Sequence, residues 1–262
     1  YKLIHKIGYR KLNVNVDGCR SLMTSTTDRQ DIQKLIKKKS HYVDYNLFGT
    51  VTGRLTTNKD SFPVLTMKSR LRSIVKPTND WLVSFDYNGA EVRTFLALSG
   101  VEQPDEDIHQ WNMKHLYGDH PIDREEAKVR FFASFYNNED NSLNDSVYSR
   151  ERVIGDYFYG DRIETPFKRK IKVDQRRAFN YIIQSTTADL TIDRAVELDK
   201  ILENTQSHVA FIVHDEIVLD IHENDRYLIP ELKEVFQNNK LGSFRANVKA
   251  GKNYGELKEL KL

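Results

Sequence analysis

The sequence predicts an α/β fold of the α+β kind, in which an antiparallel sheet is combined with a helical insertion. Residues 209–220 have apolar runs on both sides of an H-D-E triplet at 214–216, a pattern typical of two strands joined by a turn. A second apolar run, residues 81–85, has the length of a buried strand and is followed directly by Asp86. Helical patterns fill much of the sequence between these two regions.

The spacing of apolar residues and of Gly and Pro gives the expected elements in chain order. Helices are predicted over residues 28–39, 89–98, 108–117, 123–136, 151–159, 174–203 and 227–237. Strands are predicted over residues 81–85, in both halves of 209–220, and over 245–250, with a cationic ribbon over 160–172 and a polar linker over 137–144.

Composition limits the broad class of the protein. The 262 residues are 39% hydrophobic and 30% charged, and the net charge of +2 gives no whole-chain argument for nucleic acid binding. The one cysteine, Cys19, excludes an intrachain disulfide, which fits a reducing compartment. No run has the length of a membrane span or of a signal sequence, so we expect a cytoplasmic protein without membrane partners. Tyr1 in place of an initiator Met indicates a fragment or a processed product.

The two strand regions each deliver an aspartate, Asp86 and Asp215, to what could be a shared edge of the sheet. Two such carboxylates can hold two divalent metals about 3.5–4 Å apart, and oxygen ligands favour Mg²⁺ or Mn²⁺ over Zn²⁺. Taken singly, each has an ordinary explanation. Asp86 has the position of a helix cap, and residues 209–220 also suit a surface hairpin with a polar turn.

A mixed stripe marks the predicted helix over residues 123–136. Arg124, Lys128, Phe132 and Tyr136 follow one another at four-residue steps and so share a helical face. Two cations followed by two aromatics suit a polyphosphate at one end and a base or sugar at the other. The alternative is an amphipathic surface helix whose aromatics pack inward.

Two further patterns suit nucleic acid. Arg176, Asn180 and Gln184 are also four residues apart, and such donors can reach minor-groove acceptors without reading sequence. A Gly-Arg step flanked by hydroxyls, T-G-R-L at residues 52–55, can bring backbone N–H groups and a guanidinium to phosphates. A solvated helix face and an ordinary polar loop explain the two patterns equally simply.

Taken in order, these segments resemble the polymerase domain of A-family DNA polymerases, the family of bacterial DNA polymerase I and its phage relatives. The eight residues from Asp86, D-Y-N-G-A-E-V-R, resemble motif A, usually written D-Y-S-x-I-E-L-R. The stripe from Arg124 resembles motif B on the fingers helix, and H-D-E at 214–216 resembles motif C. The segment T-G-R-L, the R-x3-N-x3-Q stripe, D-I-H at 107–109 and G-K-N-Y at 251–254 match other family signatures, so the resemblance covers residues 45–255.

The resemblance implies a catalytic centre with two Mg²⁺ ions, or Mn²⁺ in their place, held by Asp86, Asp215 and the backbone carbonyl of Tyr87. One ion would lower the pKa of the primer 3′-hydroxyl, and the other would bind the triphosphate and stabilise the leaving pyrophosphate. Glu216 and His214 would support the primer end.

The resemblance also implies nucleotide and DNA contacts. Arg124 and Lys128, with His109, would bind the incoming phosphates, and Lys128 would assist catalysis. Phe132 would lie against the sugar and base. Tyr136 would lie beside the templating base, and Glu91 would act as a steric gate against the ribose 2′-hydroxyl. Contacts with primer or template would come from Thr52, Arg54, Arg176, Asn180 and Gln184.

On this resemblance the chain has a right-hand polymerase architecture with an antiparallel palm sheet. Residues 1–50 would be an N-terminal remnant at the thumb–palm connection, 51–107 the palm with motif A, 108–184 the fingers and the start of the minor-groove helix, and 185–262 the palm with motif C. The fingers and thumb are short for the family and no exonuclease signature is present. We therefore expect another domain, chain or processivity factor to supply thumb or exonuclease function.

Several positions depart from the family pattern. Residues 88–90 read N-G-A where the family has S-x-I, Tyr136 is followed by Asn in place of Gly, and Gln184 is followed by Ser in place of Gly. These changes affect the expected nucleotide selectivity and fingers motion more than the expected metal binding.

The predicted function is template-directed DNA synthesis, with dNTPs and a DNA primer-template as partners. Two alternatives remain: a non-catalytic nucleic-acid-binding module that has kept the fold, and a relative of single-subunit RNA polymerases. Glu91 and the H-D-E triplet argue against the RNA polymerase, and the absence of a Y-x-D-D turn argues against a reverse transcriptase. The small size suggests a phage or other compact replication system, in which case the bacterial host cytoplasm is the expected location.

Overall fold

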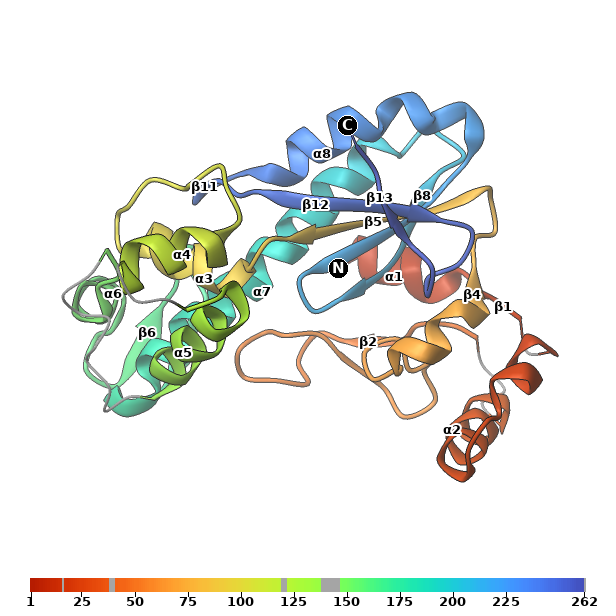
Figure 1. The fold of residues 1–262 in the computed structure, drawn as a ribbon, viewed down its shortest axis with the longest axis horizontal. Helices are drawn as coiled ribbons and strands as arrows, with labels where there is room; N and C mark the ends of the chain where they lie inside the picture. The colour runs from red at the N-terminus through yellow and green to blue at the C-terminus, as the bar shows by residue number, and fades with distance from the viewer. Residues whose placement is uncertain (16, 38–40, 119–121, 138–146, 262) are drawn as a thin grey trace. The chain divides into compact units, whose positions relative to one another are not determined.

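The computed structural model describes residues 1–15, 17–37, 41–118, 122–137 and 147–261 (Figure 1). The chain divides into two compact units. The first unit comprises Tyr1–Asp86, Thr191–Phe236 and Asn247–Leu262, and the second comprises Tyr87–Leu190 and Gln237–Ala246.

A five-stranded sheet in the order β13-β12-β5-β9-β8 organises the first unit. Its strands are β5 (Trp81–Tyr87), β8 (His208–Val213), β9 (Glu216–Ile221), β12 (Ala246–Gly251) and β13 (Lys258–Glu259). β9 pairs antiparallel with both β5 and β8, so the two apolar runs predicted from the sequence lie next to each other. The sheet lies in the first unit apart from the last residue of β5 and the first of β12.

Burial explains why these strands are almost wholly apolar. Five of the six residues of β8 and five of the six of β9 are buried, as expected for strands covered on both faces. The helix α8 (Ile229–Gln237) contributes Phe236, whose ring centroid lies 5.8 Å from that of Phe85 on β5. The helix α1 (Lys2–Tyr9) lies against β8, burying Leu3, Ile4 and Ile7.

A tyrosine hydroxyl satisfies the backbone of β8. Tyr45 donates to the carbonyl oxygen of Ile212 at 2.5 Å and accepts from the Ile212 N–H at 2.8 Å. Tyr45 is 5% exposed, and this burial raises the pKa of its hydroxyl. The hydroxyl therefore remains protonated and serves as both donor and acceptor.

The other elements of the first unit are short. They are β1 (Asn13–Val14), the 3-10 helix η1 (Asp17–Leu22), α2 (Thr26–Lys37), β2 (Tyr45–Asn46), β3 (Thr56–Thr57), η2 (Ser69–Ile74), β4 (Val75–Lys76) and η3 (Glu223–Leu228). Asp28 and Asp31 of α2 form ion pairs with Arg70 and Lys68, at and just before η2.

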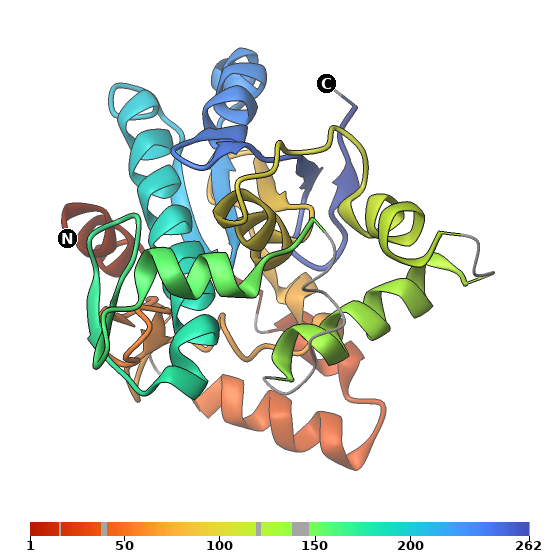
Figure 2. The same ribbon diagram turned by 90° about the vertical axis from the view of Figure 1, so that its left-hand side faces the viewer.

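The second unit is mainly helical, and its helices are seen together in the yellow to green part of the colour scale in Figure 2. They are α3 (Ala90–Leu98), α4 (Ile108–Tyr117), α5 (Arg124–Tyr136), α6 (Arg150–Tyr157) and the first part of α7 (Gln175–Ile201). Two ribbons complete the unit: β6 (Arg162–Glu164) with β7 (Lys170–Lys172), and β10 (Asn238–Asn239) with β11 (Gly242–Ser243).

An aromatic cluster forms the core of the second unit. Phe95 of α3 lies 4.8 Å from Phe179 of α7 and 5.7 Å from Phe135 of α5, measured between ring centroids. The buried Arg150 places its guanidinium 4.6 Å from the centre of the Phe179 ring. It also donates to the carbonyl oxygens of Ser134, Phe135 and Asn137, which satisfies the end of α5.

The observed elements confirm the predicted fold class of helices with an antiparallel sheet. Helix 108–117 begins and ends where the sequence predicted, and the other predicted helices differ mostly by one or two residues at each end. The predicted helix over 227–237 is instead a 3-10 turn followed by α8. Helix α1 was not predicted, and most of the predicted linker over 137–144 falls outside the described residues.

Candidate active site

The first unit brings three acidic side chains and a histidine together at the turn between β8 and β9. Asp86 on β5 is the direct cross-strand partner of Glu216, the first residue of β9. His214 and Asp215 form the two-residue turn, and His214 has a left-handed backbone with φ of 56°. Such a backbone costs a non-glycine residue roughly 1 kcal/mol or more, and strain of this kind clusters at functional sites.

The position of Asp86 rules out the simpler reading as a helix cap. Asp86 lies within β5, and Gly89 is the N-cap of the following helix α3. Gly89 has φ of 72°, and a Cβ at this position would come within 2.7 Å of Ile108 Cγ2. Gly89 stands at the variable position of the family pattern D-Y-S-x-I-E-L-R, and its positive φ and the close approach of Ile108 favour a glycine there.

Carboxylate crowding dominates the electrostatics of this site. Burial and the negative charges of Asp215 and Glu216 together raise the pKa of Asp86 to about 7. Lys249 on β12 acts in the opposite direction, but too weakly to cancel these effects. Carboxylates this close together are suited to divalent cations, whose charge offsets their mutual repulsion.

The residues present fit a metal site built on two aspartates. Asp86 and Asp215 supply hard oxygen ligands, and the Tyr87 backbone carbonyl follows Asp86 directly. Among the described residues, no three His, Cys, Asp or Glu side chains come together in a way that could hold a metal. Glu216 therefore stands beside the two aspartates without joining them in such a group.

Glu216 is held by two hydroxyl groups that the sequence did not single out. Ser84 Oγ donates to Glu216 Oε1 at 2.5 Å, and Tyr254 OH donates to Glu216 Oε2 at 2.6 Å. Burial and the nearby Glu216 charge raise the pKa of Tyr254, so its hydroxyl keeps the proton that it donates. A serine within the apolar run of residues 81–85 was the available signal.

In the second unit, Asp107 connects α4, α5 and the segment before α3. Its carboxylate accepts two hydrogen bonds from Arg124, at 3.0 and 2.8 Å, and one from the Asn88 amide at 2.7 Å. It also accepts from the backbone N–H groups of His109 and Gln110 and so caps α4. These donors, led by Arg124, hold the pKa of Asp107 below its ordinary value.

The predicted stripe on α5 faces outward from the core. Phe131 and Phe135 are fully buried, whereas Phe132 is half-buried and Tyr136 is 46% exposed. Phe132 and Tyr136 stack with centroids 5.8 Å apart, and Lys128 is half-buried on the same face. Of the two stripe aromatics, Phe132 packs against the edge of the core formed by Phe131 and Phe135, whereas Tyr136 is largely exposed.

Two other predicted nucleotide contacts lie next to this stripe. Tyr136 donates through its hydroxyl to Glu91 Oε2 at 2.6 Å. The ring centroid of His109 lies 6.0 Å from that of Phe132. His109 is buried, which lowers its pKa, and its Nδ1 has no hydrogen-bond partner among the described residues.

Arg93, the last residue of the motif A segment, is a buried structural centre whose role was not predicted. It donates to the backbone oxygens of Asn88, Pro104 and Glu106 at 2.8–2.9 Å. Burial lowers the pKa of its guanidinium to about 10. Its five donors therefore hold together the loop that carries the Asp107 carboxylate.

The residues predicted to contact DNA lie in two places. Arg176 is exposed on α7, and Asn180 and Gln184 are half-buried further along the same helix. Thr52 and Arg54 lie in the loop between β2 and β3 in the first unit, where Thr52 is buried and Arg54 is exposed. The β6–β7 ribbon is fixed to α7 by a bidentate ion pair between Arg169 and Asp189.

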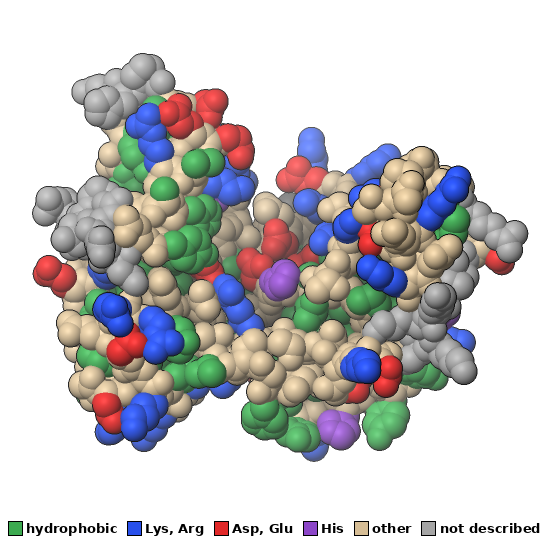
Figure 3. Space-filling model, turned by 90° about the horizontal axis from the view of Figure 1, so that it is seen from below, with side chains coloured by type: hydrophobic (Ala, Val, Ile, Leu, Met, Phe, Trp, Pro, Cys, Tyr) green, Lys and Arg blue, Asp and Glu red, His purple; other side chains and the backbone are tan. Residues whose placement is uncertain are grey.

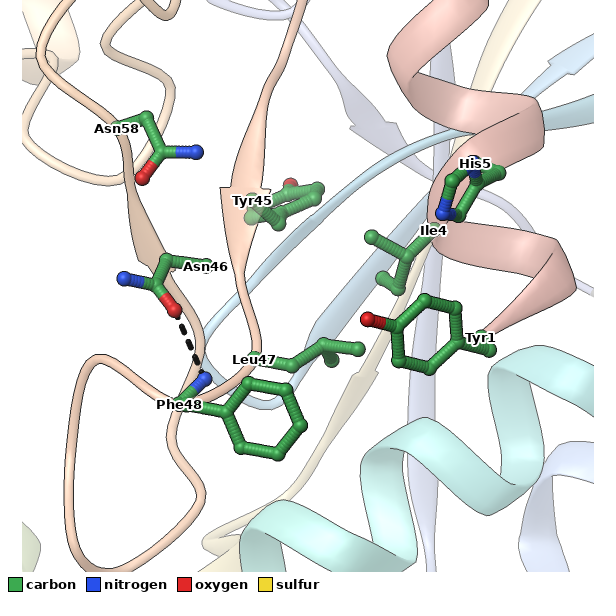
Figure 4. A pocket seen from close by; sticks show the side chains of 8 residues that line it. All are labelled: Tyr1, Ile4, His5, Tyr45, Asn46, Leu47, Phe48 and Asn58. Atoms are coloured by element: carbon green, nitrogen blue, oxygen red, sulfur yellow. Dashed lines mark hydrogen bonds between the residues drawn. The ribbon is translucent and has the colours of Figure 1, made fainter.

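A hollow of the first unit lies between α1 and the β2–β3 hairpin (Figure 4). Its volume is about 260 Å³, and it is lined by Tyr1, Ile4, His5, Tyr45, Asn46, Leu47, Phe48 and Asn58. Asn46 Oδ1 accepts the Phe48 N–H at 2.9 Å, the contact dashed in the figure. None of its lining residues is acidic, so this hollow does not compete with the carboxylate site for a metal.

Charged side chains of both signs are visible on one face of the molecule. On the face shown in Figure 3, Lys and Arg side chains are interspersed with Asp and Glu side chains and do not form one large patch.

No helix in the described part of the chain has the length and apolar character needed to cross a membrane.

Comparison with known proteins independently supports the resemblance to A-family DNA polymerases. Residues 146–256 match the family model of DNA polymerase family A. Thermostable DNA polymerase I of Thermus filiformis is 27% identical over 274 residues, covering 79% of this chain and 33% of that protein. DNA polymerase I of Synechocystis is 24% identical over 249 residues, covering 69% of this chain and 25% of that protein.

The fold is similar to that of the POL domain of Pol1 from M. smegmatis, solved in complex with DNA primer-template and dNTP. The TM-score is 0.69 at 16% identity, covering 91% of this chain and 56% of that one. The molecule thus has the fold of a polymerase domain. In its family match, its relatives and its fold, the chain is similar to the A-family DNA polymerases. It spans about a third of the length of the Thermus relative.

Proposed function

We propose that this chain catalyses DNA-directed DNA synthesis, adding deoxynucleotides to the 3′ end of a primer. The observation that carries this proposal is the crowded carboxylate site, where the charges of Asp215 in the β8–β9 turn and of Glu216 help to raise the pKa of Asp86 on β5. The similarity to A-family DNA polymerases supports it, because the same two positions resemble motifs A and C.

The two carboxylate ligands of the metal would come from the first unit, and the Tyr87 carbonyl from the first residue of the second. Asp86, Asp215 and the Tyr87 carbonyl would hold Mg²⁺, or Mn²⁺ in its place. The bound ions would lower the pKa of the primer 3′-hydroxyl and neutralise charge on the triphosphate. Glu216 would provide a fixed negative charge beside the aspartates, and the exposed His214 would contact the primer end.

The second unit would supply the nucleotide contacts. Arg124 and Lys128 would bind the triphosphate with His109, whose unpartnered Nδ1 is suited to a further polar contact. Asp107 would orient Arg124, since their bidentate pair fixes the plane of the guanidinium. Phe132 would pack against the sugar and base.

Sugar selection would depend on the hydrogen-bonded pair of Tyr136 and Glu91. The Tyr136 hydroxyl holds Glu91 Oε2 at 2.6 Å, and this would keep the carboxylate in place as a barrier to a ribose 2′-hydroxyl. Tyr136 would also lie next to the templating base.

Contacts with the primer-template would come from α7 and the β2–β3 loop. Arg176, Asn180 and Gln184 would reach the minor groove, and Thr52 and Arg54 would contact the backbone. Retaining the predicted division of the chain, residues 1–50 would connect thumb and palm, 51–107 and 185–262 would form the palm, and 108–184 the fingers. A further domain or factor would contribute the remaining contacts with duplex DNA. The protein would act in the cytoplasm, which would be that of a bacterial host if the source is a phage.

Primer extension on a DNA template tests the proposal. With Mg²⁺ and dNTPs we expect extension that Asp86→Ala and Asp215→Ala each abolish, because each removes one of the two carboxylate ligands. Asp60→Ala, at an exposed aspartate of the same unit, is the matched control and should retain full extension. If folded protein binds primer-template but never extends it with either metal, the proposal fails and the non-catalytic binding module is correct.

A further inference from the structure

The carboxylate of Glu216 is fully engaged by side chains of its own unit. Each of its oxygens accepts one short hydrogen bond from a hydroxyl: Oε1 from Ser84 and Oε2 from Tyr254. Hydrogen bonds to an ionised acceptor are stronger than neutral ones, and two of them fix both the position and the rotation of the carboxylate.

The two hydroxyl donors are themselves immobile. Ser84 is 1% exposed and lies two residues before Asp86 on β5, so the two side chains share one face of the strand. Tyr254 is 4% exposed, and its backbone N–H donates to Val75 at 2.9 Å.

The Tyr254 ring is enclosed on two sides. The ring of Phe211 on β8 lies 5.1 Å away, edge to face, and the Arg72 guanidinium lies 4.9 Å from the ring centre. Neither Ser84 nor Tyr254 can follow Glu216 if it swings toward Asp86, because both are packed into the unit. Glu216 would have to break both hydrogen bonds to reach a metal held by the aspartates.

From this geometry we propose that Ser84 and Tyr254 are positioning residues that hold Glu216 out of the metal coordination set. Asp86 and Asp215 then provide the carboxylate ligands alone, and Glu216 contributes a fixed negative charge next to them. The inference rests on the proposed function in assuming that this site binds divalent metal. It goes further in naming the residues that set the number of carboxylate ligands.

Metal binding measured without DNA or nucleotide tests the inference directly. The 262-residue chain is titrated with Mn²⁺ at a pH where the carboxylates are ionised, and the concentration of free Mn²⁺ is measured by EPR. Tyr254→Phe keeps the ring and removes only the hydroxyl, and it frees Glu216 Oε2. We expect Mn²⁺ to bind about tenfold more tightly in this variant, since an added carboxylate ligand raises affinity. Ser84→Ala should act in the same direction.

A double-mutant cycle separates positioning from a purely structural role. In a Glu216→Gln background there is no freed carboxylate, so Tyr254→Phe should leave Mn²⁺ affinity unchanged. Tyr148→Phe is the matched control, because it removes another buried hydroxyl, one that donates to Asn112 at 2.6 Å in the second unit. Wild-type affinity in both Tyr254→Phe and Ser84→Ala, or a gain that persists with Glu216→Gln, overturns the inference.

Primer extension provides the second measurement. An extra ligand on the metal should lower kcat with Mg²⁺ about tenfold, leave KM for dNTP unchanged and raise the ratio of Mn²⁺ to Mg²⁺ activity. The two proposals fail in different ways. If no variant and not even the wild type extends a primer, the proposed function is wrong while the Mn²⁺ titration still decides on Ser84 and Tyr254. If the wild type extends normally and the titration shows no change, the positioning role alone is wrong.

Discussion

Replacing Asp86 by asparagine should stabilise the metal-free protein, and by an amount that depends on pH. The substitution keeps the size of the side chain and removes its charge. In the wild type, burial together with Asp215 and Glu216 raises the pKa of Asp86 from 3.8 to about 7. The folded state therefore binds a proton at Asp86 more tightly than the unfolded state does, and ionising Asp86 at higher pH costs stability.

The pKa shift sets the size of the effect. A shift from 3.8 to about 7 corresponds to about 4 kcal/mol at about 1.4 kcal/mol per unit. Relaxation of the site and entry of water reduce such penalties, so we expect a net gain of about 2 kcal/mol for Asp86→Asn above pH 7. For a chain of this size that is a rise in Tm of about 4–8 °C. Well below pH 3.8 the wild-type carboxyl is neutral in both states, and the gain should vanish.

Thermal melting in EDTA between pH 4 and pH 9 measures the difference between the two proteins. The gap in Tm should open as the pH rises from about 4 and level off above about 7. Adding Mg²⁺ at pH 8 should stabilise the wild type and not the variant, because Asp86 is a proposed ligand. A gap that is the same at every pH, or a variant less stable than the wild type at pH 8, would refute the electrostatic argument.

Three other substitutions test separate parts of the second unit. Glu91→Ala should raise ribonucleotide incorporation about tenfold or more. Tyr136→Phe should raise it less, because the Glu91 carboxylate stays but loses its hydroxyl donor. Sugar discrimination is measured with matched rNTP and dNTP, and unchanged values in both variants would contradict the role of Glu91 as a steric gate. Arg93→Lys should lower the free energy of unfolding by about 3 kcal/mol or more, as a lysine cannot satisfy the carbonyls around this buried site; a denaturant melt within 1 kcal/mol of wild type contradicts its structural role. Asp107→Asn should raise KM for dNTP about tenfold with a smaller change in kcat, because Arg124 loses its bidentate partner. An unchanged KM in steady-state kinetics would show that Asp107 does not contribute to nucleotide binding.

The sequence could predict the strands that carry the site because their signal is local. Residues 81–85 and 209–220 are apolar enough to be recognised as buried strands, and each has an acid where the run ends. That Asp86 would pair with Glu216 in particular depends on register. Register is set by the whole sheet and not by either strand alone.

The supporting contacts of the site could not be predicted in the same way. Ser84 and Tyr254 reach Glu216 from positions 132 and 38 residues away in the chain. Asp107 has the local pattern of a helix cap, but its second role, holding Arg124, follows from the packing of α4 on α5. Hydroxyls and carboxylates have no periodic pattern, so contacts of this kind become visible only once the fold is known.

The Tyr45 hydroxyl has a consequence for the behaviour of the chain in solution. β8 is the last strand of the sheet, and the outward N–H and C=O of Ile212 are the groups to which a strand from another molecule would attach. Because Tyr45 occupies both groups and α1 lies against the same strand, another chain cannot pair with β8 at Ile212 without displacing them. The strand that leads to the proposed metal-binding turn is thus protected at this point against edge-to-edge association.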